Sequence, residues 1–301
     1  MGDKTFDVII VGGSYSGLAA GMALGRALKN VLIIDGGKPC NRQTPYSHNF
    51  ITHDGDTPAE IAALAKLQVS SYDTVQFFDG FATSGIKTEN GFEISVASSE
   101  TFAAKKLIFA TGIKDIMPDI DGFAACWGIS LLHCPYCHGY EIRNEKTGIL
   151  GSGEFGFDLA RLISNWTNDL TLFTNGPATL TAEQIKQLGK HRISIVENEV
   201  ERLEHTNGYL KNIIFRDGTT TAIRAIYASV PFEQHCKIPE SLGCELNAEG
   251  YIKIDTFQET TIKGVYACGD NATRMRTVAN AIGKGTAAGI TTSKKMIFEN
   301  F

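Results

Sequence analysis

Residues 8–17 read VIIVGGSYSG and decide the fold of this chain. The pattern predicts an apolar strand at residues 8–11, then a glycine turn, then a helix at residues 18–24. A second strand, predicted at residues 31–34, ends at Asp35, about twenty positions after the turn. This order of elements is typical of a dinucleotide-binding unit. The helix N-terminus would offer free N–H groups to a pyrophosphate, and the acid would accept a hydrogen bond from a ribose hydroxyl.

The same pattern returns in the middle of the chain. Residues 148–156 read GILGSGEFG, a short strand followed by a complete G-x-G-x-x-G. A helix is predicted at residues 157–165 and a strand at residues 170–173. The first copy departs from the fingerprint at Ser14, which stands where the second glycine belongs. An ordinary βαβ turn is the alternative for either copy alone, but two copies in register are a specific signal.

Length and composition allow two average domains or one large one. The chain has 301 residues, of which 43% are hydrophobic, and this content excludes a disordered chain. A formal charge of −5 and the lack of a basic cluster argue against nucleic-acid binding. No apolar run approaches a membrane span, and the polar N-terminus is unlike a signal peptide. We therefore expect a cytoplasmic protein that binds neither nucleic acid nor membrane.

Two further strands end in glycine. They are predicted at residues 107–111 and 265–268, and a helix is predicted at residues 278–290. Alternating segments predict small meanders at residues 79–102 and 193–226. The sequence thus predicts an α/β fold of two Rossmann-like, three-layer ββα domains, the second inserted into the first. The expected limits are residues 1–113 and 242–301 for the first domain and residues 114–241 for the insert.

The motifs together resemble the low-molecular-weight thioredoxin reductases over essentially the whole chain. They are the opening turn, the strand end 110–112, the C-x-x-C at 134–137, the second turn and the late Gly269-Asp270. Residues 127–141, WGISLLHCPYCHGYE, are more similar to the dithiol oxidases of gliotoxin and holomycin type. Ser14 and the segments 41–42, 48–49 and 53–55 are also similar to that branch. The resemblance implies FAD in the split first domain, a pyridine nucleotide in the insert, and a homodimer.

The C-x-x-C pair carries the chemistry that the sequence predicts. Cys134 and Cys137 can close a small disulfide ring and reopen it by thiol exchange. His133 and His138 bracket the pair, and an imidazole can take a proton from a thiol. His138 replaces the acidic residue that is typical of the reductases, and at neutral pH it is a better base than acid. The alternatives are a structural zinc site, an inert pair of packed thiols, and structural roles for the histidines.

The resemblance also implies a role for each site residue. Cys134 would exchange with the substrate and Cys137 would face the flavin, with His133 and His138 as further catalytic residues and no metal ligand. Thr277 stands where the reductases usually carry glutamine. The residues expected at the FAD are Gly12, Ser14, Tyr15, Ser16, Asp35, Gly36, Arg42, His48, Asn49, Phe81, Ala82, Ala110, Thr111, Gly112, Gly269, Asp270, Thr277 and Val278.

The second nucleotide site differs from the first in its charge. Thr174 lies 23 residues after Gly151, the same offset that separates Gly12 from Asp35. The typical reductases have a His-Arg-Arg segment here, whereas residues 174–176 of this chain are Thr-Asn-Gly and carry no charge. A charge-assisted contact contributes roughly 1.5–3 kcal/mol, so the loss of two or three would weaken NADPH binding by orders of magnitude. We expect FAD as the cofactor and doubt that NAD(P)H is an efficient partner.

These observations favour an FAD-dependent enzyme that oxidises a dithiol and passes the electrons to oxygen or another acceptor. The first alternative is an NAD(P)H-dependent thioredoxin reductase, and the second is a flavin redox sensor without turnover. The expected partner is a small-molecule dithiol or disulfide, or a thioredoxin-like protein.

Overall fold

The computed structural model describes residues 5–301 and divides into two compact units. Each unit combines stretches that are far apart in the sequence. The first unit contains the chain up to Arg42, residues 56–114 and residues 232–301, and the second contains residues 43–55 and 115–231.

These limits differ from the expected ones in two places. The second unit ends at Pro231, so residues 232–241 belong to the first unit, and it gains the loop at residues 43–55. The loop makes its contacts in the second unit, where the Gln43 side chain donates a hydrogen bond to the carbonyl oxygen of Trp127. An irregular loop has no hydrophobic period, so its sequence could not reveal this placement.

The sheet of the first unit is built on parallel strands. The strand order is β3-β2-β1-β6-β5-β4, and β17 pairs with β6 in parallel. Strands β4 and β5 continue the sheet as an antiparallel meander. The strands are β1 (Thr5–Val11), β2 (Val31–Asp35), β3 (Val75–Asp79), β4 (Ala82–Thr88), β5 (Gly91–Val96), β6 (Thr101–Phe109) and β17 (Val265–Ala267).

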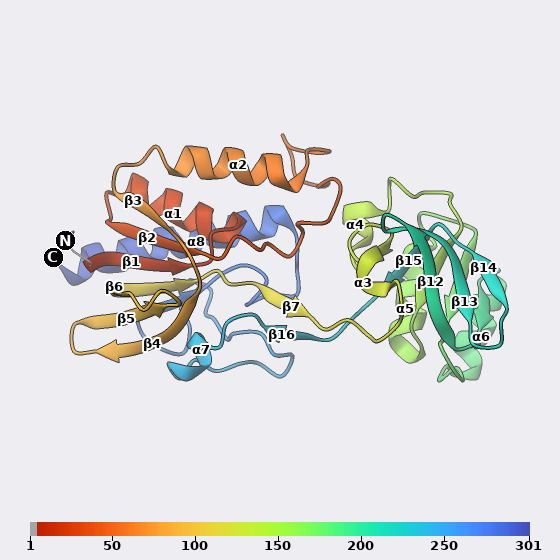
Figure 1. Cartoon of the computed structure of the whole chain (residues 1–301). Helices are drawn as coiled ribbons and strands as arrows, with labels where there is room; N and C mark the ends of the chain where they lie inside the picture. The colour runs from red at the N-terminus through yellow and green to blue at the C-terminus, as the bar shows by residue number, and fades with distance from the viewer. Residues whose placement is uncertain (1–4) are drawn as a thin grey trace. The chain divides into compact units, whose positions relative to one another are not determined.

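Three long helices cover one face of these parallel strands, on the side away from β4 and β5 (Figure 1). They are α1 (Tyr15–Arg26), α2 (Pro58–Val69) and α8 (Val278–Glu299), and a short helix α7 (Ile238–Ser241) follows β16 (Phe232–Gln234). Strand β16 pairs with β7 (Ile113–Asp115). Helices α1 and α8 approach closely, because a Cβ on Gly285 of α8 would lie 2.0 Å from the carbonyl oxygen of Ser16.

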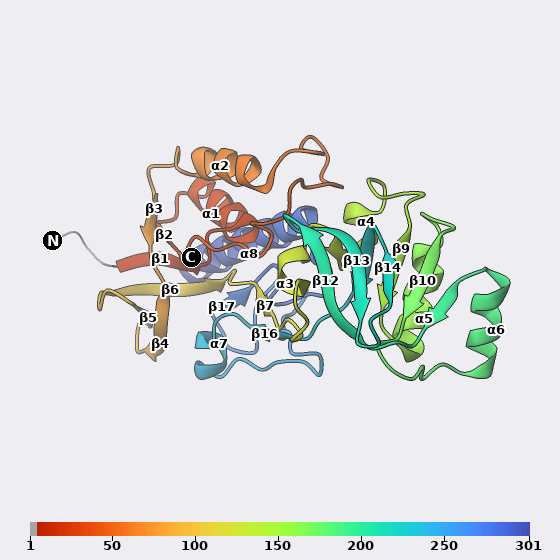
Figure 2. The ribbon, with the colours of Figure 1, turned by 45° about the vertical axis from the view of Figure 1, so that its right-hand side comes forward.

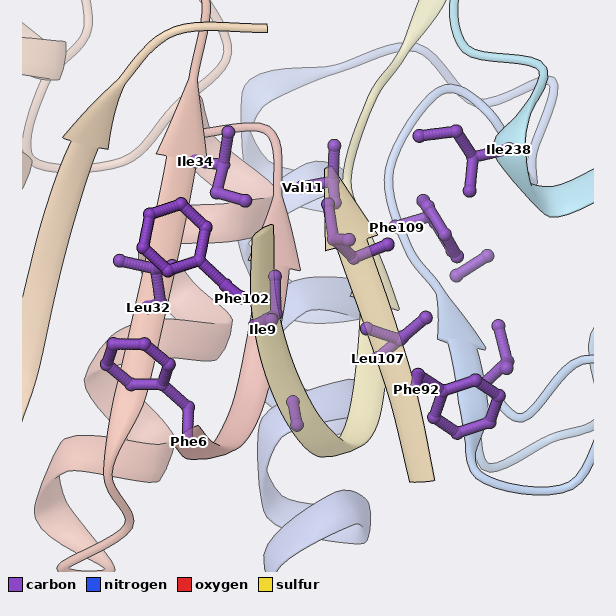
Figure 3. Packing of buried hydrophobic residues seen from close by; sticks show 14 of the residues in the cluster. Phe6, Ile9, Val11, Leu32, Ile34, Phe92, Phe102, Leu107, Phe109 and Ile238 are labelled. Atoms are coloured by element: carbon purple, nitrogen blue, oxygen red, sulfur yellow. The ribbon is translucent and has the colours of Figure 1, made fainter. Parts of the chain in front are cut away.

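The apolar face of the same sheet carries a large buried cluster. Figure 3 shows its side chains projecting from β1, β2, β5 and β6, with Ile238 of α7 beside them. The parallel strands β1 and β2 read as nearly continuous apolar runs because both of their faces are covered. The labelled members are Phe6, Ile9, Val11, Leu32, Ile34, Phe92, Phe102, Leu107, Phe109 and Ile238.

The second unit repeats this plan on a smaller scale. Its parallel sheet has the order β11-β10-β9-β15-β8, and an antiparallel sheet β12-β13-β14 lies on one side of it, opposite α5 and α6 (Figure 2). The strands are β8 (Leu131–Leu132), β9 (Thr147–Leu150), β10 (Leu170–Phe173), β11 (Ser194–Val196), β12 (Val200–Thr206), β13 (Tyr209–Phe215), β14 (Thr220–Ala222) and β15 (Ala225–Ala228). The helices are α3 (Phe123–Cys126), α4 (Pro135–His138), α5 (Gly153–Ile163) and α6 (Ala182–Lys190).

The predicted α/β class with two Rossmann-like units is confirmed. Helices α2 and α6 were not predicted, although each begins with a capping box, formed by Thr57 with Glu60 and by Thr181 with Gln184. Helix α8 extends nine residues beyond the expected Ile290, to Glu299. Within residues 5–301, no helix is both long and apolar enough to span a lipid bilayer.

The close approach of α1 and α8 gives a testable prediction. Gly285→Ala should lower the free energy of unfolding by about 1–3 kcal/mol, because a methyl group there overpacks the α1 backbone. Gly283→Ala on the same helix is the control, since its Cβ would meet no atom within 4 Å. That control should be neutral or up to about 1 kcal/mol more stable. Urea denaturation of both variants measures the difference, and equal stabilities would contradict the packing described.

Candidate active site

The first glycine turn joins β1 to α1. Gly12 has φ +107°, and a Cβ there would lie 2.3 Å from the carbonyl oxygen of Ala110, so the turn needs glycine. The N–H of Gly13 donates to a carboxylate oxygen of Asp35 over 3.2 Å. Ser14 is the N-cap of α1, but its hydroxyl makes no capping hydrogen bond. The helix N-terminus and the acid at the end of β2 therefore form the two halves of a nucleotide site.

Tyr15 and Ser16 support this turn from inside the protein. Both are buried. The Tyr15 hydroxyl donates to the carbonyl of Pro58 over 3.1 Å and accepts from the side-chain amide of Asn41 over 3.2 Å. A Cβ on Gly269 would lie 2.6 Å from the Ser16 hydroxyl, so α1 and the end of β17 are in close contact.

The ends of β6 and β17 meet at a buried amide. The side-chain amide of Asn271 donates to the carbonyl of Phe109 over 2.9 Å and to the Thr111 hydroxyl over 3.3 Å. Its amide oxygen is buried and has no hydrogen-bond partner within residues 5–301. This residue links the predicted Ala110-Thr111-Gly112 and Gly269-Asp270 turns, and the sequence analysis missed it.

The remaining expected FAD residues fall into two groups. The first unit holds Gly36, Arg42, Phe81, Ala82, Thr277 and Val278. A Cβ on Gly36 would lie 2.4 Å from the Phe81 ring, and the Thr277 hydroxyl caps α8 by accepting from the N–H of Asn280 over 3.2 Å. His48 and Asn49 instead lie in the second unit, the unit that holds the cysteine pair.

The residues of the first unit fit FAD. The glycine turn leaves the α1 N-terminus uncapped by Ser14, which suits a pyrophosphate. The Asp35 carboxylate can accept from a ribose hydroxyl, and the unpartnered Asn271 oxygen offers an acceptor beside the strand ends. FAD would supply two-electron redox chemistry at this site.

The redox pair lies in the second unit. Cys134 and Cys137 form a disulfide whose Cα atoms are 5.3 Å apart. Cys134 is the N-cap of α4 and has extended backbone angles, as expected for a residue that precedes a proline. Pro135 is the first residue of α4, so the second sulfur follows after one helical turn.

His138 is the last residue of α4, and its imidazole can accept a proton. Burial, and then the nearby positive charge of His48, lower its pKa to about 4. It is therefore uncharged at pH 7. In this form it can accept a proton, but it cannot act as a cationic acid. The same low pKa makes this ring a weaker base than a free imidazole.

His133 has a different environment. It is exposed, and its ring stacks on Trp127 with centroids 5.8 Å apart. The Trp127 indole N–H donates to Asp115 over 3.0 Å, and Phe123 also stacks on that indole. The stack orients the His133 ring at the surface, directly before Cys134 in the chain.

The second glycine turn is hydrogen-bonded to the loop that follows β10. The Ser152 hydroxyl accepts from the N–H of Thr179 over 2.9 Å and lies 3.0 Å from the Thr179 hydroxyl. The N–H of Ala178 donates to the Glu197 carboxylate over 2.7 Å. The buried Thr174 hydroxyl donates to the carbonyl of Gly176 over 2.6 Å. The segment where a 2′-phosphate would bind, residues 174–180, thus carries no charge and contacts an acid, so these residues do not fit NADPH.

Four of the other five cysteines are not placed for chemistry, the exception being the exposed Cys40. Cys268 is fully buried, and burial raises the pKa of its thiol to about 12. Burial also raises the pKa of the thiols of Cys126, Cys236 and Cys244. Thiols with raised pKa values remain protonated and unreactive at neutral pH. No cluster of three or more His, Cys, Asp or Glu side chains within residues 5–301 is arranged to hold a metal ion.

The low pKa of His138 predicts a dependence of stability on pH. The unfolded chain binds a proton at this histidine below its ordinary pKa of 6.5, whereas the folded protein does so only below about 4. Stability should therefore fall as the pH drops from 6.5 to 4, by about 3 kcal/mol at the lower end. His138→Gln should lose this contribution. Urea denaturation of both proteins at pH 7 and pH 4.5 tests it, and parallel losses would contradict it.

Comparisons with known proteins agree with this geometry. The family model for pyridine nucleotide-disulphide oxidoreductases matches residues 6–285. Thioredoxin reductase tcpT of Claviceps purpurea is 31% identical, over 97% of this chain and 94% of its own length.

Two solved structures are similar over nearly the whole chain. The putative thioredoxin reductase TrxB of Bacillus anthracis is 29% identical, with a TM-score of 0.93 over 98% of this chain and 100% of its own. HlmI is 28% identical, with a TM-score of 0.92 over 98% of this chain and 94% of its own. The chain therefore belongs to the pyridine nucleotide-disulphide oxidoreductase family, as a thioredoxin reductase-like flavoenzyme that acts on sulfur groups.

Proposed function

We propose that this enzyme oxidises a dithiol to a disulfide and delivers the electrons through the cysteine pair and FAD to oxygen or another acceptor. The observation that carries the proposal is the loop after β10, where the Glu197 carboxylate accepts from the N–H of Ala178 and residues 174–180 carry no charge. An enzyme that depends on NADPH needs a cation at this place. The resemblance to the gliotoxin and holomycin type of oxidase supports the same direction.

The chemistry balances within the cysteine pair. One substrate sulfur bonds to Cys134, the Cys134–Cys137 bond breaks, and Cys137 leaves as a thiolate. The second substrate sulfur then displaces Cys134, which releases the substrate disulfide and leaves two reduced cysteines. When FAD is bound, it accepts the electron pair and passes it on, so one dithiol and one O₂ yield one disulfide and one H₂O₂.

His138 is the base that this sequence requires. A thiol near its ordinary pKa of about 8.5 is mostly protonated at pH 7, and only its thiolate attacks a disulfide. The uncharged His138 imidazole directly follows the pair in the chain and is an acceptor for that proton, although its low pKa makes it a weaker base than a free imidazole. The exposed Tyr136 lies between the two cysteines, and His133 flanks them, so both can contact a substrate.

The rival function is NAD(P)H-dependent reduction of a thioredoxin, which the names of several relatives favour. Anaerobic stopped-flow mixing of the flavin-loaded enzyme separates the two functions. Dithiothreitol should bleach the flavin rapidly, and micromolar NADPH should bleach it at least about 100-fold more slowly, given the loss of two or more charged contacts. Rapid bleaching by NADPH would overturn the proposal. A flavin that neither donor reduces would favour a redox sensor.

The role of the cysteine pair has its own test. Cys137→Ser should abolish dithiol turnover while the protein stays yellow, because Gly12, Asp35 and the other residues of the first glycine turn lie in the other unit. Cys236→Ser is the matched control, since its thiol lies in the first unit, has a raised pKa and takes no part in the chemistry. Peroxide formation from dithiothreitol in air measures both variants. Substantial turnover by Cys137→Ser would exclude the pair from the reaction.

A further inference from the structure

The surface beside the cysteine pair is built on one tryptophan. The indole of Trp166 packs against the backbone of Gly139, where a Cβ would lie 2.9 Å from the indole Nε1 and 2.5 Å from the carbonyl oxygen of Pro135. The ring of Tyr136, which lies between the two cysteines in the chain, meets the same indole edge to face with centroids 5.5 Å apart. Trp166 therefore contacts the α4 turn of the redox pair at two points.

Trp166 also holds the segment that follows α4. Its carbonyl accepts from the N–H of Asn144 over 2.9 Å. Between these contacts the chain turns, and the N–H of Arg143 donates to the carbonyl of Tyr140 over 3.5 Å. Residues 139–144 are thus attached to one tryptophan at both ends, and that tryptophan also contacts the redox pair.

Arg143 presents a cation on this segment. The Cζ atom of its guanidinium lies 3.9 Å from the centroid of the Tyr140 ring, and its Nη1 donates to the carbonyl of Tyr140. A guanidinium within about 6 Å of an aromatic centroid is attracted by the ring face. Two contacts to one residue restrict the conformations of a long exposed side chain, so less conformational entropy is lost when a ligand binds to it.

The guanidinium has donors left for a ligand. It carries five N–H groups in a planar fork, and only Nη1 is used by Tyr140. Within residues 5–301, no carboxylate forms an ion pair with Arg143. Of the two acids that lie two residues away in the chain, Glu141 has its Oε1 3.7 Å from Nδ1 of His48, and Glu145 is exposed. A fixed and uncompensated arginine is suited to bidentate binding of a carboxylate.

A substrate at the cysteine pair can reach this cation. Tyr140 follows Cys137 by three residues, and three residues span at most about 11 Å even when fully extended. The Arg143 guanidinium lies on the Tyr140 ring, so its own position in the chain adds little to that distance. The contacts described lie within one short segment, whereas a protein partner requires a surface of about 800 Å². The patch therefore favours a small molecule.

We propose that Arg143 binds a carboxylate of the substrate and that the enzyme prefers a small dithiol that carries this group; the inference deepens the dithiol oxidation proposed above and rests on it. The ion pair forms when the dithiol binds and persists while one substrate sulfur exchanges with Cys134. Tyr140 and Trp166 are positioning residues, because they hold the guanidinium and its segment beside the pair. Arg143 takes no part in electron transfer, so its effect is on substrate binding.

Two dithiols that differ in one charge test this proposal. Dihydrolipoate carries a carboxylate, and dihydrolipoamide carries a neutral amide at the same position. Peroxide formation in air by the flavin-loaded enzyme should give a kcat/KM about 10-fold higher for dihydrolipoate, and the difference should lie in KM. The preference should decrease as sodium chloride is added, because salt screens an exposed ion pair.

Substitutions assign the preference to one side chain. Arg143→Gln should lower kcat/KM for dihydrolipoate about 10-fold by raising KM, and leave dihydrolipoamide within about 2-fold, because only the charged contact is lost. Arg143→Lys keeps the charge without the planar fork and should fall between. Arg161→Gln is the matched control, since this exposed arginine also packs over a ring, that of Phe157, but pairs with Asp158 over 3.1 Å. It should keep the wild-type ratio.

Three results would overturn the carboxylate site. The first is equal kcat/KM for the two dithiols, and the second is a preference that persists in Arg143→Gln. The third is oxidation of reduced thioredoxin that is faster than that of dihydrolipoate and is slowed by Arg143→Gln, which would assign the cation to a protein partner. If neither dithiol nor dithiothreitol bleaches the wild-type flavin, the proposed function fails first. Normal turnover of dithiothreitol without a preference for dihydrolipoate removes only this inference.

Discussion

The hydrogen bonds of the loop after β10 distinguish the second nucleotide site from the first. Ser152 in the second glycine turn accepts from the N–H of Thr179, and Glu197 accepts from the N–H of Ala178. The first turn keeps its acid at Asp35, whereas the N-cap serine of each unit makes no side-chain capping hydrogen bond. The two units therefore share an architecture but differ in their polar contacts, and those contacts determine the direction of electron flow that we propose.

The two histidines that flank the cysteine pair differ in their exposure to solvent. His138 is partly buried and directly follows Cys137 in the chain, and its low pKa leaves it uncharged at pH 7. The exposed His133, held by Trp127, is suited to contact with substrate. Two histidines that bracket one motif thus have different chemistry because one is desolvated and the other is not.

The fold could be read from the sequence because its signals are local. Gly12 and Asp35 mark the first turn, and the strand predicted at residues 170–173 matches β10 residue for residue. The helices α2 and α6 escaped because their apolar faces are weak and their signals lie in the capping residues. The site was harder to predict, because the loop at residues 43–55 joins the second unit through tertiary contacts that have no sequence period. His48, predicted at the FAD, lies on this loop.

The central claim is that a dithiol alone drives the enzyme. The most direct measurement is the stoichiometry of peroxide formed in air from dithiothreitol by the flavin-loaded enzyme, without any pyridine nucleotide. The account predicts one H₂O₂ for each dithiol oxidised and no stimulation by NADPH. Turnover that requires NADPH, or dithiol oxidation in air that yields no H₂O₂, would contradict it.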